Sequence, residues 1–201
     1  MTAWVATPDP ATLPDGQRAR RARIVQAAID LLEQSEYDAV QMRDVAREAN
    51  VALATVYRYF TSKEHLYAAA LFQWAEGFPT HGADRATVGV TDEARLRKLM
   101  RRTVRAFERH PQMMRAQLVV ELSSDPNARA IFEQFAQRQT QVLTAALSGM
   151  NAETAAAVVE TIQVVLGGRL RLWALGRSSL REVDRAVQRT IDLIFGDVGT
   201  A

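Results

Sequence analysis

The sequence predicts an all-α fold, and three observations carry this prediction. Apolar residues recur at helical spacing along most of the 201 residues, and no segment shows the sustained alternation of a β-strand. Two segments match capping boxes, Thr61–Glu64 and Ser179–Glu182. Because 48% of the residues are apolar, the chain can bury a substantial core. We therefore expect a small N-terminal helical domain followed by a larger helical domain.

The N-terminal part divides into an arm and short helices. Residues 1–16 hold three of the six prolines and show no periodicity, which predicts a flexible arm. Residues 17–76 contain neither glycine nor proline, but the apolar pattern breaks near 35–40 and 49–52, which predicts helices joined by tight turns. A further helix is expected from Thr61, with Glu64 completing its capping box. The expected buried stripes are Ile24, Ala27, Ala28, Leu31 and Leu32 in the first helix, and Val45, Ala46 and Ala49 in the second.

Residues 77–90 predict a loop, since they are rich in glycine and proline, and residues 91–201 again read as helices. Thr91 is expected to start a helix that ends at Pro111, and Asp125-Pro126 a helix that runs to Gly149. Asn151 and Ser179 are expected to cap the last two helices. The buried face of the first of these four helices is expected to consist of Leu96, Leu99, Met100, Val104 and Phe107.

Composition and missing motifs exclude most catalytic classes. The chain has no cysteine, its three histidines form no HExxH, and GxSxG, GxGxxG and P-loop motifs are absent. We therefore expect no enzyme activity, no metal and no cofactor. No apolar run reaches the roughly 18 to 20 residues of a membrane span, and the start lacks the pattern of an export signal, so we expect a cytoplasmic protein without a membrane partner.

Charge alone does not predict a partner, because the formal net charge is only +2. Four arginines nevertheless lie within Gln17–Arg23. A solvated helix start and a phosphate contact explain this cluster equally well.

Two short segments, Gln41–Ala46 and Val51–Lys63, have the layout of a helix-turn-helix, whose second helix enters the major groove of DNA. In that second helix Val56 and Phe60 can pack inward. Hydroxyls and ammonium groups on the remaining surface reach phosphates, and an arginine such as Arg58 reaches a phosphate or a guanine edge. Tyrosines there also fit a partly buried core. The expected surface residues are Leu53, Thr55, Tyr57, Arg58 and Tyr59, with Lys63 at the next helix start.

The segments around Ile24, Val40–Ala46 and Ala54–Leu66 together resemble the N-terminal domain of TetR-family transcriptional regulators over about residues 18–72. The helical remainder, about 90–196, has the lengths and order of that family's ligand-binding and dimerisation domain. The resemblance implies a three-helix DNA-binding domain at 17–76 and a ligand-binding and dimerisation domain at 91–201. It also implies DNA contacts from Arg43, from the groove-facing start Leu53, Ala54 and Thr55, and from the backbone-contact positions Tyr57, Tyr59 and Lys63.

Four positions depart from the family pattern. Ala54 stands where glycine is common, but its small side chain still lets the backbone approach the groove. Gln41 and Ala52 stand where capping hydroxyl residues are common, which predicts frayed helix starts at a cost of about 0.5 to 2 kcal/mol each. Asn50 stands where glycine is frequent, but asparagine tolerates positive φ, so the turn should be preserved.

The resulting hypothesis is a ligand-responsive repressor that binds a palindromic operator on double-stranded DNA as a homodimer. The dimer is expected to form through helices at about 152–175 and 180–195, because the first is apolar around much of its circumference. That helix could also be simply the centre of its own domain. A constitutive dimeric DNA-binding module without an effector is the alternative function, and an α-helical enzyme is the least favoured.

Large apolar side chains in the second part suit a hydrophobic effector between helices, although core packing is the commoner role of any one of them. Over the whole chain, and especially at Ala39–Arg43, Tyr57–Phe60 and Leu170–Trp173, the sequence is similar to the KstR-like branch of the family, which responds to sterol-derived acyl-CoA thioesters. This resemblance implies a lipid or CoA-thioester effector. The candidate ligand-binding residues are Met100, Val104, Phe107, Met114, Leu118, Phe132, Phe135 and Trp173.

Overall fold

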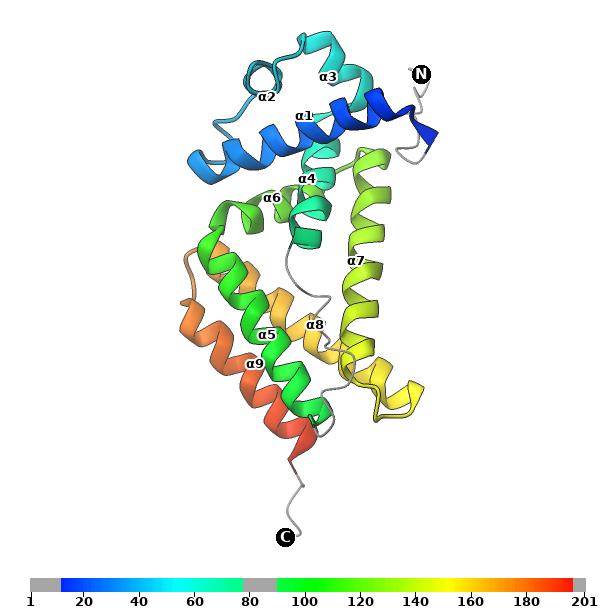
Figure 1. Cartoon of the computed structure of the whole chain (residues 1–201). Coiled ribbons are helices and arrows are strands. Elements are labelled where there is room, and N and C mark those ends of the chain that lie inside the picture. Colours follow the sequence, from blue (N-terminus) through cyan, green and yellow to red (C-terminus); the bar gives the residue numbers. More distant parts are fainter. Residues whose placement is uncertain (1–11, 78–89, 197–201) are drawn as a thin grey trace. The chain divides into compact units, whose positions relative to one another are not determined.

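A computed structural model describes residues 12–77 and 90–196, and within these ranges the chain is helical and contains no strand (Figure 1). The all-α prediction is therefore confirmed. None of the described helices is long and apolar enough to cross a membrane. In chain order the helices are α1 (Asp15–Gln34), α2 (Met42–Glu48), α3 (Leu53–Tyr59), α4 (Lys63–Gly77), α5 (Asp92–Arg109), α6 (Pro111–Glu121), α7 (Pro126–Ala146), α8 (Ala152–Ala174) and α9 (Leu180–Phe195).

The internal contacts divide the chain into two units. Unit 1 comprises Met1–Gly77 and Arg115–Phe135, and unit 2 comprises Phe78–Met114 and Ala136–Ala201. Most of the predicted arm (residues 1–11) and of the predicted loop (78–89) lies outside the described residues. Helix α1 begins at Asp15, one residue before the expected end of the arm at Gly16, and Leu13 just before the helix is buried.

In unit 1, α1 packs against α4 and α2, and α2 packs against α3. The predicted stripe of α2 is buried as expected, whereas Leu31 on α1 is only partly buried. Val25 and Ile29 extend the buried face of α1 instead. The side chains that close this core include Ile24, Leu32, Val56, Phe60, Leu66 and Leu71, all at 1% exposure or less.

In unit 2, α9 packs against both α8 and α5. The predicted caps are confirmed: Thr91 Oγ1 accepts a hydrogen bond from Ala94 N at 3.2 Å, and Asn151 Oδ1 accepts one from Thr154 N at 2.9 Å. Ser179 and Glu182 form the predicted capping box of α9. Each cap satisfies amides that a helix leaves without internal partners.

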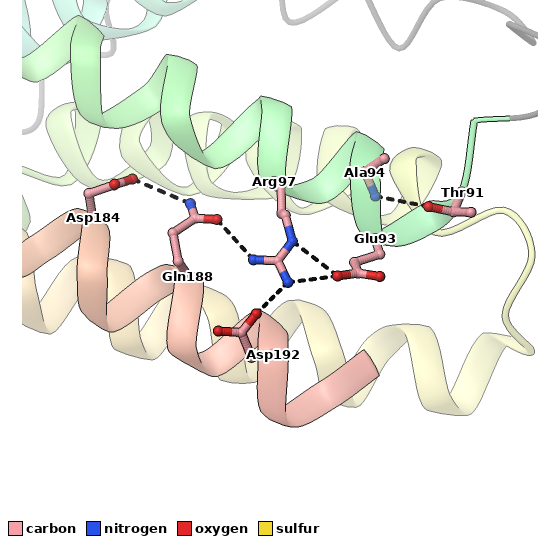
Figure 2. A network of polar contacts seen from close by, with 7 residues as sticks. All are labelled: Thr91, Glu93, Ala94, Arg97, Asp184, Gln188 and Asp192. Carbon is pink, nitrogen blue, oxygen red and sulfur yellow. Dashed lines mark hydrogen bonds and ion pairs between the residues drawn. The ribbon is translucent and has the colours of Figure 1, made fainter. Parts of the chain in front are cut away.

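A polar network joins α5 to α9 in unit 2 (Figure 2). The Arg97 guanidinium donates to Glu93 Oε1 at 2.6 and 3.1 Å on its own helix, and to Gln188 Oε1 at 3.1 Å and Asp192 Oδ1 at 2.5 Å on α9. Gln188 in turn donates to Asp184 at 3.3 Å. These hydrogen bonds raise the pKa of Arg97 above its ordinary value. The network fixes the register between the two helices.

Helix α6 was not anticipated from the sequence. Pro111 ends α5, as expected, but it is also the first residue of α6. Proline suits this position because its missing N–H would have no intrahelical partner there. Asp125-Pro126 acts as predicted: Asp125 Oδ1 accepts hydrogen bonds from Asn127 N at 2.8 Å and Ala128 N at 3.3 Å, at the start of α7.

Candidate DNA-binding surface

The turn between α2 and α3 is built by main-chain hydrogen bonds. Val51 N donates to Ala46 O at 2.9 Å, and Asn50 N donates to Arg47 O at 3.1 Å, which is the Schellman pattern of a helix C-terminus. Asn50 has a φ of 51°, as the sequence predicted for a turn in which asparagine replaces glycine. The two short helices are therefore joined by a tight turn, the layout of a helix-turn-helix.

The starts of α2 and α3 differ in how they are capped. At α2 the Asp44 carboxylate accepts the hydrogen bond of Gln41 N at 3.1 Å and lies 3.1 Å from the Arg47 guanidinium. The expectation of a frayed start at Gln41 is therefore wrong, because the residue three positions on supplies the acceptor. Ala52 provides no side-chain cap to α3, as expected.

One face of α3 is available to a partner. Leu53 is 40% and Tyr57 51% exposed, Ala54 and Arg58 are also exposed, and Thr55 is partly exposed. On α2, Arg43 is exposed as well. These residues combine apolar, hydroxyl and guanidinium groups, which are the groups that contact bases and phosphates.

Tyr59 does not belong to this exposed face. Its side chain is only 3% exposed, and its hydroxyl is buried without a hydrogen-bond partner among the described residues. The expectation that Tyr59 lies on the surface is therefore wrong. In a helix of seven residues the tyrosine faces the core together with Val56, and the guanidinium of Arg58 lies over its ring, 5.3 Å from the centroid.

Lys63 is partly buried and already has partners in unit 1. Its ammonium donates to the main-chain oxygen of Tyr37 at 2.5 Å and lies 4.0 Å from the centroid of the Tyr37 ring. Burial lowers its pKa, although Asp38 and Glu64 oppose this effect. The lysine thus holds the segment between α1 and α2 as well as standing at the start of α4.

The start of α4 is capped by Ser62 and not by Thr61. Ser62 Oγ accepts a hydrogen bond from His65 N at 3.0 Å, so the predicted capping box of Thr61 and Glu64 is wrong. Thr61 Oγ1 instead donates to Asp125 Oδ2 at 2.8 Å and accepts from Asn127 Nδ2 at 3.2 Å. The segment that follows α3 is therefore hydrogen-bonded to the start of α7 within unit 1.

His65 completes this polar cluster. The main-chain N–H of Thr61 donates to His65 Nδ1 at 3.2 Å, and the imidazole stacks edge-on against Phe60 with centroids 5.2 Å apart. Burial lowers the pKa of His65 to about 4, with Asp125 opposing and Arg21 reinforcing the shift. Burial alone would raise the pKa of Asp125, but hydrogen bonds from Ser62, Thr61 and two main-chain amides lower it overall. Sequence reasoning identified Asp125 as a helix cap but gave no signal of its partner Thr61, 64 residues away.

The candidate ligand-binding residues fall in both units. Met100, Val104, Phe107, Met114 and Trp173 belong to unit 2, and Leu118, Phe132 and Phe135 to unit 1. Leu118, Phe132 and Trp173 are partly exposed and the other five are buried. Phe132 and Phe135 contact each other, with ring centroids 5.8 Å apart.

The pair α8 and α9 presents apolar side chains to its surroundings. Val164 is 69% and Leu193 79% exposed, and Leu172 and Leu175 are exposed too. An open groove of about 630 Å³ runs between the two helices and is lined by Val164, Leu172 and three arginines (Arg169, Arg185 and Arg189), among others. Exposed apolar residues in this number commonly mark a protein interface.

Comparisons with known proteins agree with this geometry. Residues 24–70 match the model of "bacterial regulatory proteins, tetR family", and residues 89–194 match a "tetracyclin repressor-like, C-terminal domain". The HTH-type transcriptional repressor KstR of Rhodococcus jostii (strain RHA1) is 32% identical over 184 residues, covering 91% of this chain and 86% of that protein.

Solved structures show the same fold. A TetR transcriptional regulator from Rhodococcus sp. RHA1 superposes with a TM-score of 0.73 at 25% identity, covering 92% of this chain and all of that one. The regulator FadR of Bacillus subtilis, in complex with stearoyl-CoA, superposes with a TM-score of 0.66 at 14% identity, covering 88% and 98%. Taken with the helix-turn-helix in unit 1, these matches show that the chain belongs to the TetR family of DNA-binding transcriptional regulators.

Proposed function

We propose that this protein is a homodimeric repressor that binds a palindromic operator through α3 and leaves it when a hydrophobic or acyl-CoA-type molecule binds. The exposed face of α3 carries the proposal, because Leu53, Tyr57 and Arg58 extend from a helix that a helix-turn-helix presents to the major groove. The name of the Rhodococcus jostii relative, a transcriptional repressor, supports the sign of regulation. We place the action of this protein in the cytoplasm, where a bacterial operator is accessible.

The exposed residues divide by chemistry into two roles. Arg43 and Arg58 carry the planar fork that reads the two acceptors of a guanine edge. Leu53 and Ala54 stand at the start of α3, where the backbone approaches the groove, and Thr55 and Tyr57 supply hydroxyls for phosphates. Lys63 can contact a DNA phosphate only if its ammonium turns from the Tyr37 carbonyl. The burial of the Tyr59 hydroxyl argues against a DNA contact from that residue.

A second copy of the chain is the partner proposed for the α8–α9 surface. Covering Val164, Leu172, Leu175 and Leu193 removes apolar area from water, which stabilises a dimer by about 25 cal/mol per Å². A twofold dimer would place its two α3 helices in successive major grooves about 34 Å apart.

The effector class rests on apolar chemistry. The large side chains of α5, α6 and α7 offer deformable apolar surface for a hydrophobic ligand. The bound stearoyl-CoA of the FadR structure shows that the same fold accommodates a long acyl chain. Release from the operator requires that such a molecule bind the DNA-incompatible conformation more tightly than the DNA-bound one.

Selection of bound sequences from a random duplex library, followed by titration of the selected duplex, tests the proposal. A palindromic consensus bound by two protomers is the expected result. Arg43→Ala should weaken binding to that duplex by about 1 to 3 kcal/mol and reduce the base preference at one position. If the Lys63 ammonium turns from the Tyr37 carbonyl to a phosphate, Lys63→Ala should weaken binding to all duplexes alike and lower the salt slope by about one per protomer. Recovery of no consensus would contradict operator binding.

Stearoyl-CoA added to the complex serves as the effector probe. It should lower operator affinity, and a shorter acyl-CoA should do so less because it buries less apolar surface. Operator affinity that is insensitive to both, together with a clean apo mass in native mass spectrometry of protein from its host, would favour the constitutive module over the ligand-responsive repressor.

A further inference from the structure

The first turns of α1 hold most of the excess positive charge of the helices around the candidate DNA surface. Residues 15–23 contain four arginines and only Asp15 as an acid, whereas α2 and α3 together contain three arginines against Asp44 and Glu48. Helices α2 and α3 therefore carry little net charge of their own. Affinity for a duplex depends mainly on how many phosphates the protein neutralises.

Arg21 fixes the place of this basic segment. Its guanidinium carbon lies 4.9 Å from the centroid of the Phe60 ring, and Phe60 is the residue that ends α3 through its N–H to Val56 O at 2.9 Å. Burial lowers the pKa of Arg21 below its ordinary value. Figure 1 shows the start of α1 beside the end of α3, so the basic segment flanks the recognition helix in unit 1.

Two of the remaining arginines are available. Arg18 pairs with Asp15. Arg23 is exposed and Arg20 partly exposed, and neither has an ion-pair partner among the residues that the structure describes. They are three residues apart, so they lie on the same side of α1. Their guanidinium groups can hydrogen-bond phosphate oxygens in a bidentate manner.

We infer that Arg20 and Arg23 are additional phosphate contacts, which bind the DNA backbone beside the groove that α3 enters. This inference rests on the proposed operator binding. It enlarges the interface beyond the helix-turn-helix and assigns to α1 a part of the sequence-independent affinity. Because phosphates carry no sequence information, these contacts strengthen binding to every duplex equally.

The experiment compares the double variant Arg20→Gln, Arg23→Gln with the wild-type protein on two duplexes, the selected operator and a random sequence of the same length. The slope of log K against log salt concentration should become shallower by about 0.9 per lost contact, hence by close to two per protomer on both duplexes. The ratio of operator to random affinity should stay unchanged. The matched control, Arg129→Gln with Arg177→Gln, removes the same charge from two other exposed arginines and should leave the slope as it is.

Several outcomes would overturn the inference. An unchanged slope in the double variant, a slope change equal to that of the control, or a loss confined to the operator would each do so. If the double variant does not fold, as judged by its helical circular dichroism, Arg23→Gln alone should still lose about one unit of slope per protomer. The charge-retaining Arg20→Lys, Arg23→Lys variant should keep the wild-type slope. A wild-type protein that prefers no duplex in the selection would instead refute the proposed function.

Discussion

The buried histidine at the start of α4 makes the stability of the protein depend on pH. His65 is 3% exposed, its Nδ1 accepts the hydrogen bond of Thr61 N, and burial lowers its pKa from 6.5 to about 4. The folded state therefore holds His65 neutral where the unfolded chain would begin to protonate it. Because the unfolded state binds more protons, stability is complete above the unfolded pKa and falls as the pH drops below it towards the folded pKa.

The size of the effect follows from the two pKa values. Between about pH 7.5 and about pH 5 the unfolded chain takes up most of one proton that the folded protein does not, which lowers the free energy of unfolding by about 2 kcal/mol. Asp125 does not contribute in this window, because its lowered pKa places its own loss of stabilisation at more acidic pH.

Urea unfolding at the two pH values, at one fixed protomer concentration, measures this loss. His65→Asn should be less stable at neutral pH, since it removes a buried ring packed on Phe60, but it should lose about 2 kcal/mol less than the wild type between the two pH values. His110→Asn is the control: it removes another histidine and keeps His65, so the loss of stability that His65 causes on acidification should remain. If His65→Asn and the wild type lose equal stability on acidification, the reasoning is refuted.

Three further changes test other parts of the structure. Tyr59→Phe should leave operator affinity unchanged and leave stability equal or raise it by about 1 kcal/mol in thermal unfolding, since it removes a buried hydroxyl without a partner; a large affinity loss would restore Tyr59 as a DNA contact. Ser62→Ala should lower the unfolding free energy by about 1 kcal/mol and Glu64→Gln by less, and the reverse order would favour the Thr61–Glu64 box. Val164→Glu should convert the proposed dimer to monomers in analytical ultracentrifugation, and an unchanged sedimentation coefficient would contradict the proposed α8–α9 interface.

Local signals made much of the fold predictable. The caps at Thr91, Asn151 and Ser179 depend on residues three positions apart, so the sequence contains all the information that each one needs. The positive φ of Asn50 is similar, because few residue types tolerate it.

Two errors lie where packing or a distant partner decides the outcome, and a third lies where two local signals coincide. The spacing of Thr61 and Glu64 matched a capping box, but the Thr61 hydroxyl donates a hydrogen bond to Asp125, and Ser62 caps α4 instead. Tyr59 seemed exposed because α3 is too short for periodicity to distinguish its faces, so packing against neighbouring helices places the ring. Helix α6 begins at the proline that ends α5, and the stop signal concealed the start signal.

The left-handed residue Asn50 has an evolutionary consequence. The crossing of α2 and α3 is held by a main-chain dihedral and two main-chain hydrogen bonds, not by the side chains that face outward. In the proposed complex, substitutions at Leu53, Ala54 or Arg58 therefore alter which bases are preferred, while α3 keeps its approach to DNA. A β-branched residue at position 50 would instead disturb recognition of every sequence at once. Single substitutions on α3 can thus produce new operator preferences in related proteins, while the turn at Asn50 keeps its conformation.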